Sequence, residues 1–425
     1  MSFNYAAAGA VVLGALLAPS SSLAQAGLAP PDTLTLAVAL AIARDGNPAL
    51  HAARLNADAA QERIRPAGTL PDPGLSFALM NRPLGDFGTS EPMTMNQVQL
   101  TQMVPWPGKL GFAKEREQHL AEAERLDAAE AEVALVARLK SVYYQLAYMD
   151  RSLVIMNDTR DLLRDFLRIS STMYAVGAGR QQDVLQAQVA VASMSEDITV
   201  MEQERLAMGA RLNALLGRGA TDPVGGLELP APEREVPGVD SLMAMAAMNR
   251  PALAAARARV MAADAGYRRA RRELYPDIMV GVAYGERPQF DDMTTFMVGV
   301  SIPLFAGSRQ LPLRREMEAM RASQEAMALD LYNETFAQLA EQRADADRSR
   351  RLSQLYATSI VPQARASVES ALSAYRVGDV DYMTLVESEM TVNRYAIESI
   401  RLVAKFHQAI AGMEALMGVE FGGAP

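Results

Sequence analysis

The residues that most often do chemistry are scarce in this 425-residue chain, which has three histidines and no cysteine. His51, His119 and His407 share none of the spacings that bring ligands to one metal ion. The sequence contains no nucleophile–base pair, no phosphate-binding loop and no dinucleotide fingerprint. We therefore expect no enzyme activity, no catalytic residue, no metal centre and no cofactor.

Methionine is the residue type that could suit a particular ligand, because the chain contains 25 of them. Thioether sulfur favours soft ions such as Cu(I). Methionine is also a flexible filler of apolar cores, and scattered methionines more often serve packing. Both interpretations stay open at the level of sequence.

A glycine turn between long helical runs occurs twice, in 174–185 and in 375–386. Both copies read Tyr-x-Val-Gly, and they lie 201 residues apart. Glycine lets the backbone reverse direction and lets another chain approach closely. The chain is therefore predicted to consist of two similar halves, each built around one turn.

Long helices flank both turns. The first is predicted over 109–173, which would reach roughly 100 Å, with a return helix over 183–216. In the second half, a helix over 313–374 is followed by a return helix that ends at Gly418. Apolar residues in the first helix recur at spacings of 4 and 3, the pattern of a coiled-coil seam: Leu135, Leu139, Val142, Leu146, Met149 and Leu153.

Two predicted strands precede each long helix, over 74–80 and 93–104 in the first half and over 278–285 and 295–302 in the second. A helix over 34–65, interrupted at 46–48 and ended by Pro66, comes before the first pair. Three of the strands alternate bulky apolar residues with Gly, Ala, Ser or Met, which suits lipid on one face and a lumen on the other. An ordinary antiparallel sheet packed on helices would alternate similarly.

Four strands cannot close a barrel, so a membrane sheet would require several copies, and three copies would give 12 strands.

The domain organisation follows from composition. Residues 1–26 are predicted to be an export signal, with an apolar run too short to span a bilayer and a small-residue cleavage site. The first repeat is assigned to 27–218, a Gly- and Pro-rich linker to 219–238 and the second repeat to 239–425. The net charge of −9 argues against a nucleic-acid partner.

This combination of a signal, a duplicated helix–strand–strand–helix–turn–helix order and paired Tyr-x-Val-Gly turns resembles the TolC family of outer-membrane efflux ducts over essentially the whole mature chain. The resemblance implies a mainly α protein with a small membrane β-sheet. Long coiled-coil helices would form a periplasmic α-barrel, and four strands per chain would complete a 12-stranded trimeric β-barrel in the outer membrane of a Gram-negative bacterium. The partners would be outer-membrane lipid, a periplasmic adaptor and an inner-membrane pump of the resistance-nodulation-division type.

The resemblance also assigns residues near the turns. It implies that Val176, Gly177, Val377 and Gly378 contact the adaptor.

A periplasmic gate is implied by the same resemblance. Asp183 and Tyr375 match latch positions, while Val380 stands where a latch arginine is expected. Glu387 matches one acidic ring, and Thr384 replaces the acid of the other. The gate is therefore expected to be held differently here; a solvated surface role for Glu387 is equally open.

Segments 80–84, 91–95 and 104–109 are similar to the heavy-metal branch of that family, which serves copper/silver or cobalt/zinc/cadmium pumps. Export of heavy-metal cations is therefore the first hypothesis for the substrate. A duct for multidrug efflux or type I protein secretion is the alternative within the family. A coiled-coil scaffold that transports nothing is the alternative from another class.

Overall fold

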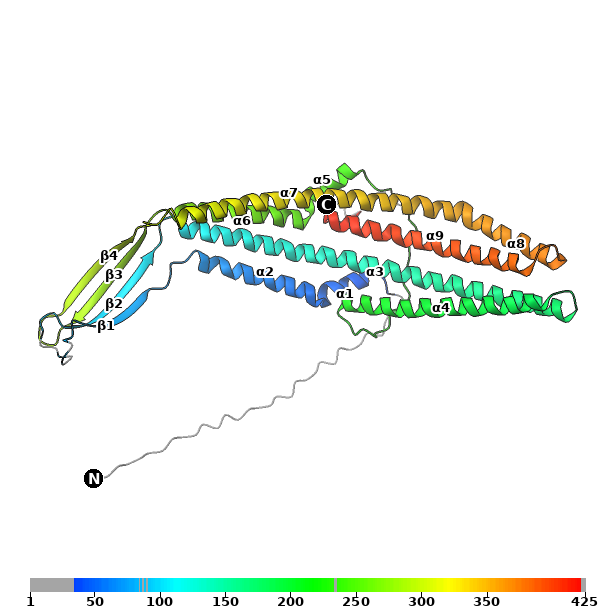
Figure 1. Cartoon of the computed structure of the whole chain (residues 1–425), viewed down its shortest axis with the longest axis horizontal. Helices are drawn as coiled ribbons and strands as arrows, with labels where there is room; N and C mark the ends of the chain where they lie inside the picture. Colours follow the sequence, from blue (N-terminus) through cyan, green and yellow to red (C-terminus); the bar gives the residue numbers. More distant parts are fainter. Residues whose placement is uncertain (1–33, 84, 86–87, 89–90, 233–234, 422–425) are drawn as a thin grey trace, which may run out of the picture.

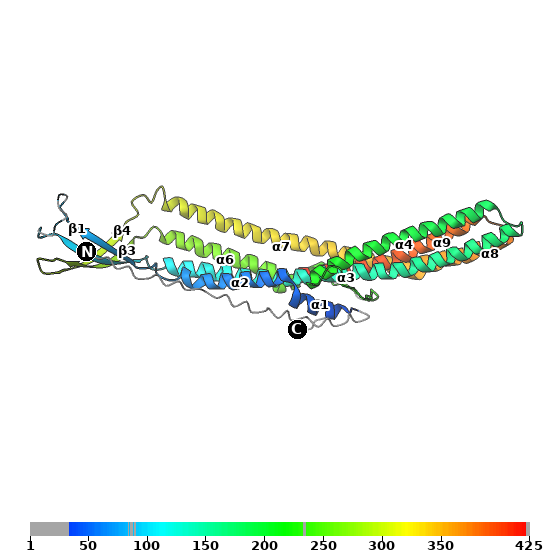
Figure 2. The same cartoon turned by 90° about the horizontal axis from the view of Figure 1, so that it is seen from below.

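The computed structural model describes residues 34–421, except 84, 86–87, 89–90 and 233–234. The chain forms a long rod, with a β-sheet at one end and two helical hairpins at the other (Figures 1 and 2). The predicted export signal lies outside the described residues. Within the described part of the chain, no helix has both the length and the apolar character needed to cross a bilayer.

The helices of the first half are α1 (Leu36–Gly46), α2 (Pro48–Ala67), α3 (Lys109–Ala175) and α4 (Gln181–Leu216). Those of the second half are α5 (Val239–Asn249), α6 (Pro251–Arg272), α7 (Gln310–Leu355), a π-helical turn (Tyr356–Ile360), α8 (Val361–Val377) and α9 (Tyr382–Met417). The strands are β1 (Gly74–Met80), β2 (Met95–Val104), β3 (Asp277–Glu286) and β4 (Met293–Ser301).

Helix α3 is the longest element, and it packs against α2 and α6 toward the sheet and against α4 and α9 toward the far end. Its seam is buried as its spacing predicts, since Leu139 and Leu146 are fully enclosed and Leu135 and Met149 almost so. Burial of a leucine side chain stabilises by about 1.5–3 kcal/mol. Packing along this seam, rather than propensity alone, therefore maintains the rod.

One predicted helix end was wrong because of a proline. Helix α2 continues through Pro66 to Ala67. A proline in the last turn removes a hydrogen bond where the helix is about to end, and Gly68 and Thr69 donate instead to carbonyls at the helix end.

The helix predicted over 313–374 extends over 310–377, but a π-helical turn at Tyr356–Ile360 divides it. Pro362 has no N–H for the carbonyl of Thr358, and its ring would crowd that carbonyl in a regular α-helix. The wider turn accommodates the proline, and the N–H of Val361 donates to the carbonyl of Tyr356, five residues back.

The four strands form one antiparallel sheet in the order β1-β2-β3-β4. Strand β2 begins at Met95 instead of residue 93, because Thr94 closes a turn by donating its N–H to Glu91 and its hydroxyl to Asn81. The sheet extends beyond the helices (Figure 1), so the alternative of a sheet packed on helices is wrong.

The register places the bulky residues of all four strands on one face. Leu75 lies opposite Leu100, Leu100 opposite Val282 and Val282 opposite Phe296. This apolar face is exposed in the chain, with Phe296 82% and Leu75 73% accessible. Small and methionine side chains occupy the other face, as the alternation predicts. The 12-stranded trimeric barrel remains a prediction.

Candidate functional site

The hairpin between α3 and α4, here called the first tip, turns at Gly177. The N–H of Ala178 donates to the carbonyl of Met173 at 2.8 Å, and the N–H of Gly177 donates to Tyr174 at 3.0 Å. This pair of bonds is a Schellman motif, which requires a left-handed residue. Gly177 supplies it with φ of 74°.

The hairpin between α8 and α9, the second tip, repeats this geometry. Gly378 has φ of 83°, and the N–H of Asp379 donates to the carbonyl of Ala374 at 3.0 Å. Val176 and Val377 are 73% and 72% exposed, and no atom lies within 4 Å of where a Cβ would stand on either tip glycine. Each tip therefore presents an accessible Val-Gly pair at the end of the rod.

Of the predicted gate residues, the structure brings Asp183 and Tyr375 together. Tyr375 is buried. Burial is the main cause that raises the pKa of its phenol, and the negative charge of the nearby Asp183 carboxylate raises it further. Tyr382 packs edge-on against it, with ring centroids 5.7 Å apart. Tyr382 was not predicted from the sequence, although its position seven residues after Tyr375, across the turn, indicates that the two tyrosines can meet.

Thr384 and Glu387 are placed differently. Asp381 caps α9 by accepting the N–H of Thr384 at 2.9 Å and its hydroxyl at 2.8 Å, bonds that lower the pKa of Asp381. Thr384 therefore helps to begin the helix. Glu387 is exposed one turn further along α9, apart from the buried tyrosines.

Glu389, which the sequence analysis also missed, is only 4% exposed. It lines a cleft between α3, α8 and α9 together with Arg365, near the hydrogen bond from Thr159 to Asn393. Burial raises the pKa of the Glu389 carboxyl, and the charge of Arg365 opposes that shift. Glu389 lies four residues after the buried Leu385, which is the spacing of a helix seam, and this spacing is the sign of its burial in the sequence.

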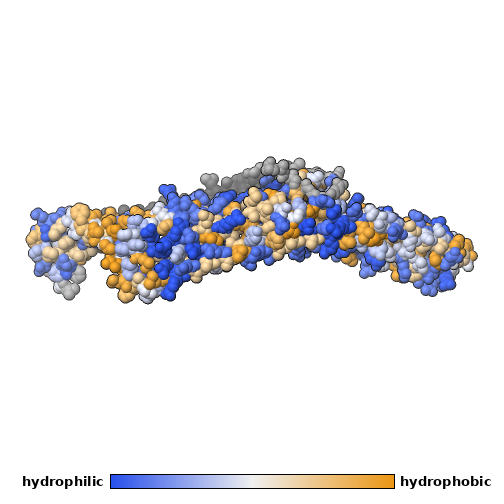
Figure 3. All heavy atoms as spheres, turned by 90° about the horizontal axis from the view of Figure 1, so that it is seen from above, coloured by the Kyte–Doolittle hydropathy of each residue, from blue (hydrophilic) through white to orange (hydrophobic). Residues whose placement is uncertain are grey.

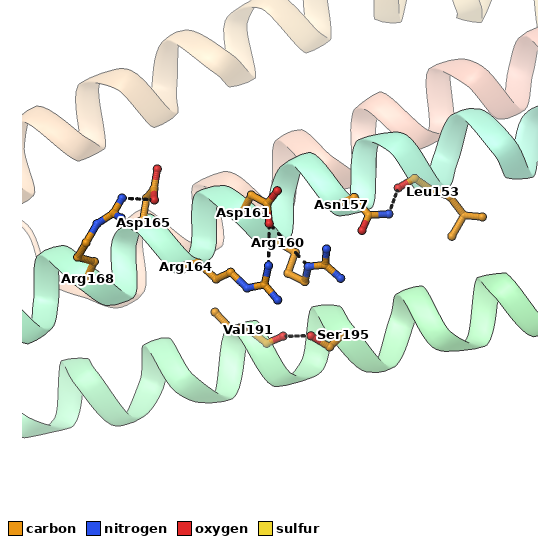
Figure 4. A network of polar contacts seen from close by, with 9 residues as sticks. All are labelled: Leu153, Asn157, Arg160, Asp161, Arg164, Asp165, Arg168, Val191 and Ser195. Carbon is orange, nitrogen blue, oxygen red and sulfur yellow. Dashed lines mark hydrogen bonds and ion pairs between the residues drawn. The ribbon is translucent and has the colours of Figure 1, made fainter.

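The side of α3 above the first tip carries a row of ion pairs (Figure 4). Asp161 pairs with Arg164 at 2.9 Å and with Arg160 at 3.8 Å, and Arg168 pairs with Asp165. Asp161, Arg164, Asp165 and Arg168 are all more than half accessible. Exposed pairs of this kind contribute about 0–1 kcal/mol each, so the row is a solvated surface rather than a binding centre.

In the described segments, no three His, Asp or Glu side chains converge as ligands of one metal ion. His407 stacks on Tyr144 at 4.7 Å, and its Nε2 lies 2.9 Å from the carbonyl oxygen of Pro230. Burial lowers the pKa of this histidine. These contacts make His407 a packing residue of the helix layer.

Comparisons with known proteins bear on the whole chain. The family model described as outer membrane efflux protein matches residues 39–218 and 242–419. The pyoverdine export outer membrane protein OpmQ of Pseudomonas putida is 24% identical over 326 residues, 73% of this chain and 67% of that protein. The multidrug resistance outer membrane protein MdtP of Escherichia coli is also 24% identical, over 49% of this chain and 44% of that protein. The chain thus spans less than half the length of this second relative.

Solved structures share the fold. The outer membrane protein VceC from Vibrio cholerae superposes with a TM-score of 0.79 at 17% identity, covering 91% of this chain and 96% of VceC. The channel CusC gives a TM-score of 0.74 at 15% identity, covering 90% and 92%. The family match covers both halves and all the tip residues described above. The chain therefore belongs to the outer membrane efflux protein family.

Proposed function

We propose that this protein is the outer-membrane channel of a tripartite efflux system. Three copies would join their sheets into a 12-stranded barrel and their helices into a periplasmic tunnel. A periplasmic adaptor would contact the tips and link them to an inner-membrane pump of the resistance-nodulation-division type. An export signal over 1–26 would direct the chain to the periplasm. The family is one of channels, which argues against both an enzyme and a scaffold that transports nothing.

The observation that carries this proposal is the exposed apolar face shared by all four strands. A face with Phe296, Val298 and Leu75 each more than 70% accessible is unfavourable in water and suits lipid. Strands β1 and β4 each have an unpaired edge in the single chain. Lipid does not tolerate open sheet edges, so copies of the chain would have to pair them.

The junction between sheet and helices supports a membrane boundary at this point. Trp106 stacks on Tyr275 with centroids 5.4 Å apart, and Arg272 lies over the same tyrosine ring. Aromatic side chains gather where membranes meet water, and basic groups there can meet lipid phosphates. Figure 3 shows apolar surface at the sheet end and a hydrophilic band over the adjoining helix ends.

A buried ion pair fixes the sheet relative to the helices. Lys109, the first residue of α3, is 6% exposed and bonds Asp277 of β3 at 2.8 Å and Glu273 at 3.1 Å. Asp277 also accepts the N–H of Trp106 at 2.8 Å. The sheet and the rod are thereby joined by side chains that satisfy one another, as a continuous duct would need.

The tips would be the adaptor contact, because Val176 and Val377 are exposed without any role in the core. The test is a double variant, Val176→Asp with Val377→Asp, beside Val38→Asp, an exposed valine on α1. We expect the tip variant to reach the outer membrane as a heat-resistant trimer and conduct ions in planar bilayers, but to lose export in cells. Export equal to that of the Val38 variant would overturn the adaptor role, and a monomer outside the membrane would overturn the channel.

Two substrate classes have separate support. Heavy-metal cations fit the methionines on the small face of the sheet, whereas the names of OpmQ and MdtP point to organic compounds. A strain lacking the gene would be challenged with copper, silver, zinc, cobalt and cadmium, and with dyes, bile salts and antibiotics. Sensitivity to metals alone supports the first class, and sensitivity to organic compounds alone supports the second. Loss of a secreted protein would instead indicate type I secretion.

A further inference from the structure

The small-residue face of the sheet carries six methionines, and the register gathers them into two groups of three. Strand pairing places Met80 opposite Met95 and Met103 opposite Met279, and it places Met293 and Met297 opposite glycines of β3. Because residues directly opposite share a face, all six lie on the side away from the bulky apolar residues. The six are Met80, Met95, Met103, Met279, Met293 and Met297.

The outer group surrounds Gly285, near the end of the sheet farthest from the helices. Met80 on β1 pairs with Met95 on β2. Met95 leans over Gly285, where its sulfur would lie 2.6 Å from an added Cβ. Met293 on β4 is the direct partner of Gly285 on the other side. The missing side chain at Gly285 thus makes room for the Met95 sulfur on the face that Met293 shares, with Met80 beside Met95 on the next strand.

The inner group lies toward the helices. Met103 on β2 pairs with Met279 on β3, which pairs with Gly299 on β4. The methyl of Met279 would lie 3.2 Å from a Cβ at Gly299. Met297, two residues before Gly299 on the same face, extends its methyl over Gly281 at the same distance. Glycine again makes room for methionine.

These methionines differ from core filler, because no helix of the described chain covers them. Met103, Met279 and Met293 are each more than 40% accessible. The rest of this face is Gly, Ala, Ser, Thr and Gln, apart from Asp277, which is held by Lys109. Apart from this paired carboxylate, the face lacks the carboxylates and imidazoles that Zn²⁺ and Co²⁺ prefer, and its distinctive donor is thioether sulfur.

We infer that the thioethers of neighbouring methionines in each group form a weak binding site for a soft monovalent cation, Cu(I) or Ag(I). The inference rests on the proposed function, in which this face lines the lumen. Neutral thioethers can ligate such an ion without adding charge, so the ion is held less tightly than by thiolates. Successive weak sites allow an ion both to enter and to leave a pore. Six groups would line the trimer at two levels.

The test uses Ag(I), which is stable to air, added to the purified full-length trimer carrying ¹³C-methyl methionine. Two triple variants remove one group each: Met80→Leu, Met95→Leu, Met293→Leu, and Met103→Leu, Met279→Leu, Met297→Leu. Leucine keeps the volume and apolar character but removes sulfur. The matched control changes Met248, Met261 and Met327 to leucine, which are exposed on helices.

We expect Ag(I) to shift the methyl signals of the six sheet methionines, each triple variant to lose its group's shifts, and affinity to fall roughly tenfold when both groups are removed. The control should bind like the unchanged protein. No shift at the sheet methyls, or equal binding by the variants, would overturn the inference. Bilayer conductance of every sample separates this result from failure of the channel: conductance without Ag(I) binding refutes the methionine sites alone.

Discussion

At the scale of single residues, left-handed glycines end the long helices of both halves, but in two different surroundings. Gly177 and Gly378 stand in open space at the tips. Gly217 and Gly418 end the return helices against backbone: a Cβ on Gly217 would lie 2.3 Å from the carbonyl oxygen of Gly46, and one on Gly418 would lie 2.6 Å from that of Asn249. The same conformation therefore turns the chain in open space at one end of the hairpin and allows close packing of backbones at the other.

A pair of alanine variants separates the free-energy cost of a left-handed alanine from the cost of crowding its Cβ against neighbouring backbone. Gly177→Ala should lose about 1–2 kcal/mol of stability, the penalty of a left-handed alanine. Gly217→Ala should lose clearly more, because its φ of 68° carries the same penalty and its Cβ also meets Gly46. Denaturation followed by circular dichroism would measure both. Equal losses would show that the return helix can move away from Gly46 without cost.

Glu389 gives a pH-dependent prediction at the same scale. Burial raises the pKa of its carboxyl in the folded protein, so the folded state binds a proton more readily than the unfolded chain. The free energy of unfolding should therefore fall as the pH rises from the unfolded value, about 4.3, through the raised folded value. Glu389→Gln should be more stable than the unchanged protein at neutral pH, and the advantage should disappear near pH 4.

The matched control is Glu387→Gln, because Glu387 is exposed on the same helix. Its thermal unfolding should follow that of the unchanged protein across the same pH range. If the Glu389 variant has the same pH profile of stability as the unchanged protein, water reaches the cleft and the pKa of this carboxyl is not raised. Glu387 was predicted by resemblance and Glu389 was not, because a charged residue is normally solvated and only the packed helices enclose Glu389.

At the scale of elements, the helices and strands were predictable where the pattern is local. The seam of α3 and the alternation of the strands depend on spacing alone, and both occur as expected. The π-helical turn before Pro362 was not predicted. A proline can end, kink or widen a helix, and the widened turn here packs against α9. The sequence shows the proline but not the partner helix.

The seam itself can be tested by removing one leucine. Leu139 is completely buried between helices, so Leu139→Ala should lower stability by about 2–5 kcal/mol through lost burial and a residual cavity. Leu206→Ala, at a position that is 62% exposed on α4, should cost much less. The temperature at which helical signal is lost would measure the difference. Similar values for the two variants would mean that the seam relaxes to fill the gap.

At the scale of the whole molecule, two chemically distinct faces of one sheet decide how the rod can be used. The alternation of bulky and small residues along the strands predicts these two faces. The number of copies and the side that meets lipid depend on contacts between chains. A charge placed on each face of β4 tests the sidedness directly. Val298 lies on the bulky face and is 78% exposed, and Thr295 lies on the small face and is also exposed.

Val298→Lys should prevent assembly, because a lysine facing lipid costs about 2–4 kcal/mol in each copy near the bilayer centre. Thr295→Lys should still form the heat-resistant trimer, since a lumen accepts charge, and it should reduce cation conductance in planar bilayers. If Thr295→Lys fails to assemble and Val298→Lys succeeds, the sheet faces lipid with its methionine side, and the proposed metal-binding surface would lie outside the pore. The pair therefore determines the orientation on which both the channel and its thioether groups depend.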